Sequence, residues 1–209
     1  MEPRETNRPC LRPAIPEIAV AALYLSDAVT AHLEGDTKRA GELILLADMP
    51  VIREWVESLW GKASPYRLYR AVEDTPVVLT KEFRIRARMP SLADKLKLLE
   101  RDCYCCRFCG VPVVRSEIRQ ILHKMYPEAL PWGRTNGSQH AAFQAMWAQF
   151  DHILPHARGG TNDLENVVVT CAPCNFGRMD YTLAELGLCD PRVREPISID
   201  WDGLERLLG

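Results

Sequence analysis

Four cysteines, arranged as two C-x-x-C pairs, constrain the fold of this chain more than any other feature of its sequence. Cys106 and Cys109 form the first pair, and Cys171 and Cys174 form the second. A two-residue spacer lets one tight turn direct both thiolates toward the same ion, and two such turns complete the tetrahedral shell of a zinc ion. Because sulfur takes all four positions, such a zinc stabilises the fold and leaves no position for water or substrate. The pairs therefore predict a structural zinc site, with the chemistry located elsewhere.

Other interpretations of the cysteines stay open at this point. Cys103 and Cys106 have the same spacing as the first pair, so a second register exists. Gly110 directly after Cys109 favours the Cys106–Cys109 register, since the turn after the second ligand commonly needs a permissive backbone. A redox-active C-x-x-C is a chemical alternative, but neither pair lies in a pattern typical of a thioredoxin-like βαβ unit. Unrelated free thiols are the third alternative.

Composition excludes several classes of protein. Of the 209 residues, 47% are hydrophobic and 26% are charged, which is typical of a soluble globular chain and not of a disordered one. The longest apolar run, 18–25, has eight residues, whereas a membrane-spanning helix needs about 20. The first ten residues carry acid and proline where a signal peptide has a basic start and an apolar stretch, so a cytoplasmic location is expected. The net charge of −2 means that any contact with nucleic acid must come from a local basic patch.

The first part of the chain, 1–80, predicts a helical domain. Apolar residues recur at helical spacing after Pro16, Asp36 is placed to cap a second helix, and Pro50 is placed to open a third that ends at Gly61. This region contains no nucleotide-binding loop, no acidic pair in a recognisable site and no detectable repeat. We therefore interpret it as a scaffold, or as a surface for a protein partner or a second copy of the chain.

A basic run follows the predicted boundary near residue 80. It consists of Lys81, Arg84, Arg86 and Arg88. In an extended segment, a spacing of two places the three arginines on one side. Such a run can neutralise backbone phosphates of a nucleic acid, or it can simply face solvent, and both interpretations stay open.

The residues between the two cysteine pairs, 111–149, predict a helical insert. Apolar spacing predicts one helix from Ser116 to Met125 and another from Ser138 to Trp147. We expect the insert to pack against the N-terminal helices. A substrate or partner surface around Trp132 is the alternative.

The segment that leads into the second cysteine pair predicts a hairpin followed by a helix. Residues 149–154 and 166–170 are rich in apolar and β-branched side chains, and a loop with two glycines separates them. Residues 171–180 predict a short helix. The resulting ββα unit allows an acid, a histidine and two asparagines to converge, namely Asp151, His152, Asn166 and Asn175.

This combination resembles the HNH endonuclease family, whose fold is a ββα-metal finger that is often held by zinc knuckles. The matching motifs are Arg101-Asp102, Cys106-x-x-Cys109-Gly110, Asp151-His152-Ile153-x-Pro155, Gly159-Gly160-x-Asn162-x-x-x-Asn166 and Cys171-x-x-Cys174-Asn175. They lie within residues 100–180. The resemblance implies an α+β protein in which an N-terminal helical domain precedes a zinc-stabilised HNH nuclease domain over residues 81–209.

The resemblance also implies a role for each matching residue. His152 is expected to be the general base that deprotonates the attacking water, a task suited to an imidazole with a pKa of about 6.5. Asp151 and Asn175 are expected to bind a divalent ion, and their oxygen donors favour Mg²⁺ or Mn²⁺ over Zn²⁺. Asn175 stands where many relatives have histidine, which makes this an HNN-type variant. Asn166 is expected to hydrogen-bond across the hairpin and to hold the loop that carries His152.

Three further side chains complete the implied site. His156, Arg158 and Arg178 are expected to contact substrate phosphates, with a merely solvated position as the alternative. The function implied by the resemblance is a metal-dependent endonuclease that hydrolyses DNA by nicking or double-strand cleavage, in restriction or phage defence. The competing hypotheses are a zinc-knuckle module that binds nucleic acid or protein without cutting, and a nuclease that acts on RNA.

Overall fold

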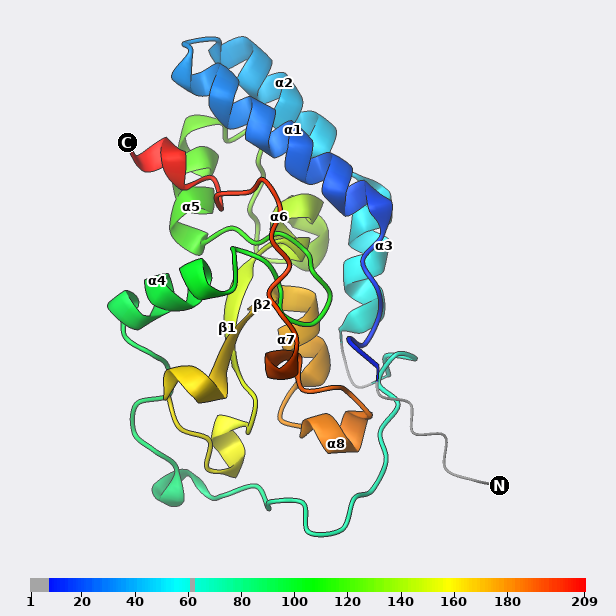
Figure 1. The fold of residues 1–209 in the computed structure, drawn as a ribbon. Helices are drawn as coiled ribbons and strands as arrows, with labels where there is room; N and C mark the ends of the chain where they lie inside the picture. The colour runs from blue at the N-terminus through cyan, green and yellow to red at the C-terminus, as the bar shows by residue number, and fades with distance from the viewer. Residues whose placement is uncertain (1–7, 61–62) are drawn as a thin grey trace.

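The computed structural model describes residues 8–60 and 63–209, and it contains both helices and strands (Figure 1). In chain order the elements are α1 (Pro16–Leu33), α2 (Thr37–Ala47), α3 (Pro50–Leu59), α4 (Leu92–Arg101), α5 (Ser116–Met125), α6 (Ala141–Ala145), β1 (Ala148–His152), β2 (Val167–Cys171), α7 (Ala172–Arg178) and α8 (Leu183–Leu186). The predicted α+β fold class is confirmed. None of the helices in these residues has the length and apolar character that crossing a bilayer requires.

The three N-terminal helices form where the sequence predicts them. Pro16 and Pro50 occupy the first positions of α1 and α3, where a missing N–H costs nothing. The Asp36 carboxylate accepts a hydrogen bond of 2.9 Å from the backbone N–H of Arg39 and so caps α2. Gly61, the predicted end of the third helix, lies outside the described residues, and α3 ends at Leu59.

A single cluster of buried apolar side chains runs through the described chain from Cys10 to Leu204. It is continuous because α3 packs against α6 and α7, and α1 also contacts α6. At Gly177, helix α7 approaches the end of α3 so closely that an added methyl group would lie 3.0 Å from the backbone oxygen of Leu59. The boundary near residue 80 stays a prediction about independent folding.

The connector between α3 and α4 runs around the lower edge of the molecule in Figure 1. Over residues 63–90 it contains only one 3-10 turn, Lys81–Phe83, and no strand. Backbone hydrogen bonds attach it to the C-terminal half, including Leu79 N–H to the carbonyl of Ala157 at 2.8 Å. The connector therefore passes beside the hairpin before α4 begins.

The insert between the cysteine pairs differs from expectation in its second helix. The first helix, α5, has the predicted bounds, whereas α6 has only five residues. Ser138 lies in a separate 3-10 turn, and after α6 the chain pairs with Val114, which accepts from Ala148 N–H at 2.9 Å and donates to Met146. This pairing ends the helix before Trp147. The insert does pack against the N-terminal helices, where the His140 ring bonds to the carbonyl of Ile44 at 2.9 Å.

Candidate active site and metal centre

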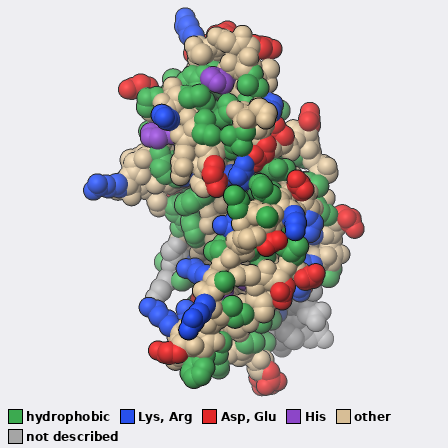
Figure 2. All heavy atoms as spheres, turned by 90° about the vertical axis from the view of Figure 1, so that its left-hand side faces the viewer, with side chains coloured by type: hydrophobic (Ala, Val, Ile, Leu, Met, Phe, Trp, Pro, Cys, Tyr) green, Lys and Arg blue, Asp and Glu red, His purple; other side chains and the backbone are tan. Residues whose placement is uncertain are grey.

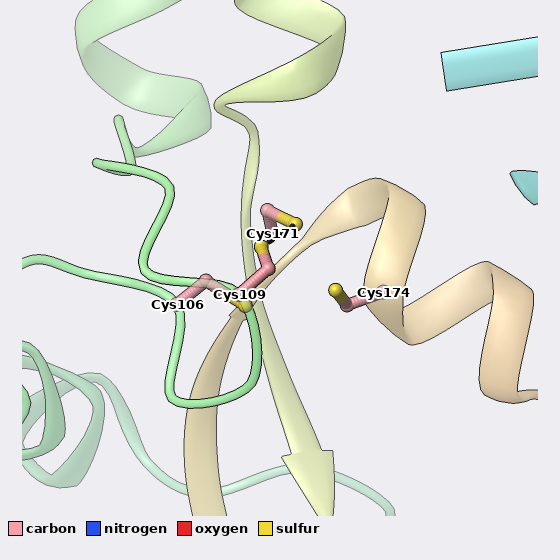
Figure 3. A group of neighbouring side chains, drawn as sticks. All are labelled: Cys106, Cys109, Cys171 and Cys174. Carbon is pink, nitrogen blue, oxygen red and sulfur yellow. Dashed lines mark hydrogen bonds between the residues drawn. The ribbon is translucent and has the colours of Figure 1, made fainter. Parts of the chain in front are cut away.

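The four cysteines of the two C-x-x-C pairs come together in one cluster. They are drawn in Figure 3, where they come from the loop after α4, the end of β2 and the first turns of α7. All four Sγ atoms lie within 4.8 Å of one another, and Cys109 Sγ is 3.6 Å from Cys171 Sγ. Zinc–sulfur bonds of about 2.3 Å in a tetrahedron place the sulfurs about 3.8 Å apart. The cluster fits a structural zinc ion.

The geometry also decides between the two registers of the first pair. Neither Cys103 nor Cys105 belongs to the cluster. Burial raises the pKa of the Cys105 thiol to about 12, which is typical of an inert packed cysteine. Gly110 has a φ of +77°, and its N–H donates to the Cys106 carbonyl at 2.9 Å. The turn after the second ligand needs the left-handed backbone that glycine allows.

Asp102 connects the cysteine loop to the sheet. Its side chain is 1% exposed and accepts a hydrogen bond of 2.8 Å from the backbone N–H of Val169 on β2. Arg101 donates to both of its carboxylate oxygens at 2.8 Å. A buried carboxylate that is paired and hydrogen-bonded in this way orders the segments around it. The Arg-Asp dipeptide therefore holds the first cysteine pair against β2.

The hairpin of β1 and β2 carries the candidate catalytic residues at one end. The strands are antiparallel, and His152 lies opposite Val167. Asn166 braces the loop between them, because its Oδ1 accepts from Leu154 N–H at 2.9 Å and its amide N–H group donates to the Thr161 carbonyl at 2.8 Å. The contacts expected of Asn166 across the hairpin are thus present. Gly160 lies so close to Leu154 that a methyl group there would be 1.8 Å from its carbonyl oxygen.

The surroundings of His152 define which ring nitrogen carries the proton. Its Nε2 lies 2.8 Å from Oδ1 of Asn162, whose Nδ2 donates to the Ala87 carbonyl at 2.7 Å. A carbonyl can only accept, so the Asn162 amide must direct its nitrogen to Ala87 and its oxygen to the imidazole. Nε2 therefore donates, and the lone pair of the neutral ring lies on Nδ1, which bonds to none of the described residues. Burial lowers the pKa of His152, and the Asn162 hydrogen bond partly opposes this shift.

Asp151 is paired with Arg178 inside the protein. Arg178 is 1% exposed and donates from Nε to Oδ2 of Asp151 at 2.7 Å, and a second nitrogen donates to Oδ1. The same guanidinium bonds to the carbonyls of His152 and Tyr181. Arg178 therefore connects the end of β1 to the end of α7 and is not exposed as a phosphate contact.

The other two predicted phosphate contacts are also engaged with the protein. His156 Nε2 lies 2.8 Å from the carbonyl of Ile85. Arg158 donates to the Asp180 carbonyl at 2.7 Å and pairs with the buried carboxylate of Glu185 at 3.1 Å. Both side chains therefore bond to the protein itself, a role that the sequence did not suggest for them.

A cleft of about 1060 Å³ opens in front of the hairpin. Asp151, His152 and Asn175 all line it, and the Asn175 amide nitrogen donates to Gln149 Oε1 at 3.4 Å. Asn166 does not line the cleft, and its side chain bonds instead to the loop between β1 and β2. The structure thus brings the acid, the histidine and one asparagine to a single open site, with the second asparagine as a brace.

Sequence reasoning missed two relationships at this site. Asn162 belongs to the motif quoted for the family resemblance, yet its hydrogen bond to His152 has no local signal. The pairing of Arg178 with Asp151 was also missed, because the sequence suggested a phosphate contact for Arg178 instead. A buried acid calls for a cationic partner, but the sequence does not show that Asp151 is buried, so no local signal identifies Arg178 as that partner.

Comparison with known proteins agrees with this geometry. Residues 141–187 match the family model described as HNH endonuclease. The matched segment contains β1, the braced loop, β2, α7 and α8, and it includes the second cysteine pair. This part of the chain is therefore similar to an HNH endonuclease domain. Searches of curated proteins and of solved structures found no match.

Proposed function

We propose that this protein is a metal-dependent endonuclease that hydrolyses DNA, with His152 as the general base. The observation that carries the proposal is the tautomer of His152, which directs the lone pair of Nδ1 away from Asn162 within a residue that lines an open cleft. The lowered pKa keeps the ring neutral near pH 7. A neutral imidazole of this kind can take a proton from water that attacks a phosphodiester.

Asp151 and Asn175 supply the hard oxygen donors for a divalent ion in the same cleft. Each carboxylate oxygen has two lone pairs, so Asp151 can accept from Arg178 and still bind a cation. Carboxylate and amide oxygens favour Mg²⁺ or Mn²⁺. When bound, the ion supplies charge neutralisation at the phosphate and at the departing 3′ oxygen. The expected products carry 5′-phosphate and 3′-hydroxyl ends.

The other residues of the site act by positioning. Asn162 keeps the proton of His152 on Nε2, and Asn166 holds the loop that follows the histidine. Arg178 fixes the carbonyl of His152 and the side chain of Asp151 together. We place the activity in the cytoplasm, where reduced thiols remain available to zinc. The family resemblance alone suggests restriction or phage defence as the setting.

The test is cleavage of supercoiled plasmid in the presence of Mg²⁺ or Mn²⁺. Wild type is expected to produce nicked or linear DNA, and His152→Ala is expected to lose about 100-fold or more of the rate. His123→Ala is the matched control, since that ring bonds to the Leu130 carbonyl on the insert and not in the cleft. Both variants should keep one zinc per chain.

Equal cleavage by wild type and His152→Ala would contradict the assignment of the base. If DNA is bound but not cut by folded, zinc-loaded wild type, the zinc-knuckle binding module is the better interpretation. Cleavage of RNA but not DNA under the same conditions would move the substrate to RNA.

A further inference from the structure

A segment far from the hairpin in sequence is attached to the loop of the candidate active site. We call residues 79–89 the basic strap. Three hydrogen bonds connect it to the loop after β1, namely Leu79 N–H to the Ala157 carbonyl at 2.8 Å, the His156 ring to the Ile85 carbonyl at 2.8 Å, and Asn162 Nδ2 to the Ala87 carbonyl at 2.7 Å. The strap is therefore held beside the candidate site along most of its length.

The cations of the strap border the same cleft as His152. Lys81, Arg84, Arg86 and Arg88 all line it, as do Asp151 and Asn175. Figure 2 shows Lys and Arg side chains gathered around a hollow in the lower part of the face that carries the strap. The arginine spacing that predicts a shared side thus corresponds to a shared cleft.

Most of these cations have no hydrogen-bond or ion-pair partner among the residues that the structure describes. Lys81, Arg86 and Arg88 are exposed, and their side chains make no hydrogen bond or ion pair with residues 8–60 or 63–209. Arg84 differs, because its Nε donates to the Leu79 carbonyl at 2.9 Å. Elsewhere at the site, Arg158 and Arg178 are each committed to a buried carboxylate. The strap therefore holds the cations that remain available to a ligand.

The acids that line the cleft do not cancel this charge. They are Glu82, Asp151 and Asp180. Asp151 is neutralised by Arg178, and Glu82 accepts a hydrogen bond of 2.6 Å from Thr80. Four cations face two acids outside the buried pair, so the mouth of the cleft is electropositive although the whole chain carries a charge of −2.

We propose that the basic strap binds the phosphodiester backbone of the substrate next to the scissile phosphate. Cations spread along a segment suit a polyanion better than a single small anion, because successive charges can meet successive phosphates. The strap also contacts Asn162. The Asn162 amide therefore connects the strap, where the DNA backbone is proposed to bind, to His152, the proposed general base. The inference rests on the proposed function for the identity of the ligand as DNA.

The experiment measures binding separately from cleavage. A fluorescent DNA duplex is titrated, without divalent ions, into His152→Ala protein and into the same protein with Arg86→Gln and Arg88→Gln added. We expect about tenfold or more weaker binding, and a plot of log affinity against log salt concentration that is shallower by about two, because each lost phosphate contact reduces the slope by about one. The matched control adds Lys38→Gln and Arg39→Gln, which remove the same charge from exposed positions on α2.

The α2 control is expected to bind DNA as tightly as the His152→Ala protein with an unaltered strap, and with the same dependence of affinity on salt concentration. Unchanged affinity and slope after the strap substitutions would overturn the proposal. An equal loss in the α2 control would also overturn it, because the effect would then reflect net charge. Absence of DNA binding by all three proteins overturns the strap proposal as well, whereas the nuclease assignment is decided independently by plasmid cleavage with wild type.

Discussion

Arg178 holds both carboxylate oxygens of Asp151, the residue directly before the candidate general base. Both side chains are buried, and the guanidinium also reaches the backbone of His152. A planar guanidinium matches a carboxylate with two parallel hydrogen bonds, which fixes orientation as well as charge. The pair therefore sets the geometry of β1 and α7 at the point where the chemistry is expected.

Removal of one member of this pair should destabilise the fold strongly. Arg178→Met leaves a buried carboxylate without its partner, and we expect a loss of about 3–5 kcal/mol in the free energy of unfolding. Asp151→Leu combined with Arg178→Met should lose less than Arg178→Met alone, because no buried charge then remains. Chemical denaturation of the zinc-loaded proteins measures both values. Additive costs in the double variant would contradict this account.

The ring of His152 should titrate below its ordinary pKa of 6.5, because burial disfavours the imidazolium. NMR of zinc-loaded protein without a second divalent ion measures the midpoint, and His152→Ala assigns the signal. Asn162→Ala should lower the midpoint further, since the Asn162 hydrogen bond raises the pKa of His152. A midpoint at or above 6.5 in the wild type would be evidence against the buried neutral ring.

The same shift predicts the direction of the pH dependence of stability. Below pH 6.5 the unfolded chain takes up a proton that the folded site does not yet accept. The free energy of unfolding should therefore fall as the pH drops from 6.5 to the folded pKa, and His152→Ala should remove this contribution. Denaturation at a series of pH values gives the comparison.

Zinc content should depend on one register of the first cysteine pair. Cys106→Ser removes a ligand of the cluster and is expected to reduce zinc to well below one per chain and to lower the melting temperature, since a structural zinc contributes directly to folding. Cys103→Ser is the matched control, because Cys103 lies outside the cluster. Elemental analysis after dialysis provides the measurement. Loss of zinc in the control and not in Cys106→Ser would reverse the assignment.

Gly160→Ala should disrupt the loop behind the candidate site. The new methyl group would lie 1.8 Å from the backbone oxygen of Leu154, so one of the two segments has to move. We expect a lower melting temperature and reduced cleavage, with zinc content unchanged because the cysteine cluster is elsewhere. Gly137→Ala is the control, as nothing lies within 4 Å of a methyl group there. Equal behaviour of the two variants would show that the loop tolerates the displacement.

Local patterns predicted the parts of this protein that depend on neighbouring residues. The helix starts at Pro16 and Pro50 and the cap at Asp36 follow from short-range rules, and each is found. The cysteine cluster was also predictable, because a two-residue spacer leaves few geometries for two thiolates. The second helix of the insert was overestimated because pairing with Val114, more than thirty residues away, overrides the apolar spacing near Trp147.

Other features depend on contacts between distant segments, for which one sequence carries no signal. The strap lies 75 residues from its contact at Asn162, and nothing in the local pattern of either segment predicts their pairing. The burial of Arg178 was likewise hidden, since an exposed phosphate contact and a buried partner of Asp151 have the same spacing on α7. In both cases the missing information is which polar group elsewhere in the chain each of these residues contacts.

The close approach of Leu59 to Gly177 bears on how this finger can be exchanged between proteins. Helix α7 carries Cys174 of the cysteine cluster and Asn175 of the cleft, and it packs against α3. Recombination or design that transplanted the hairpin and α7 alone would leave that covered surface in water. A protein that receives this segment therefore has to supply a helix of matching shape, so α3 should be transferred together with the hairpin and α7.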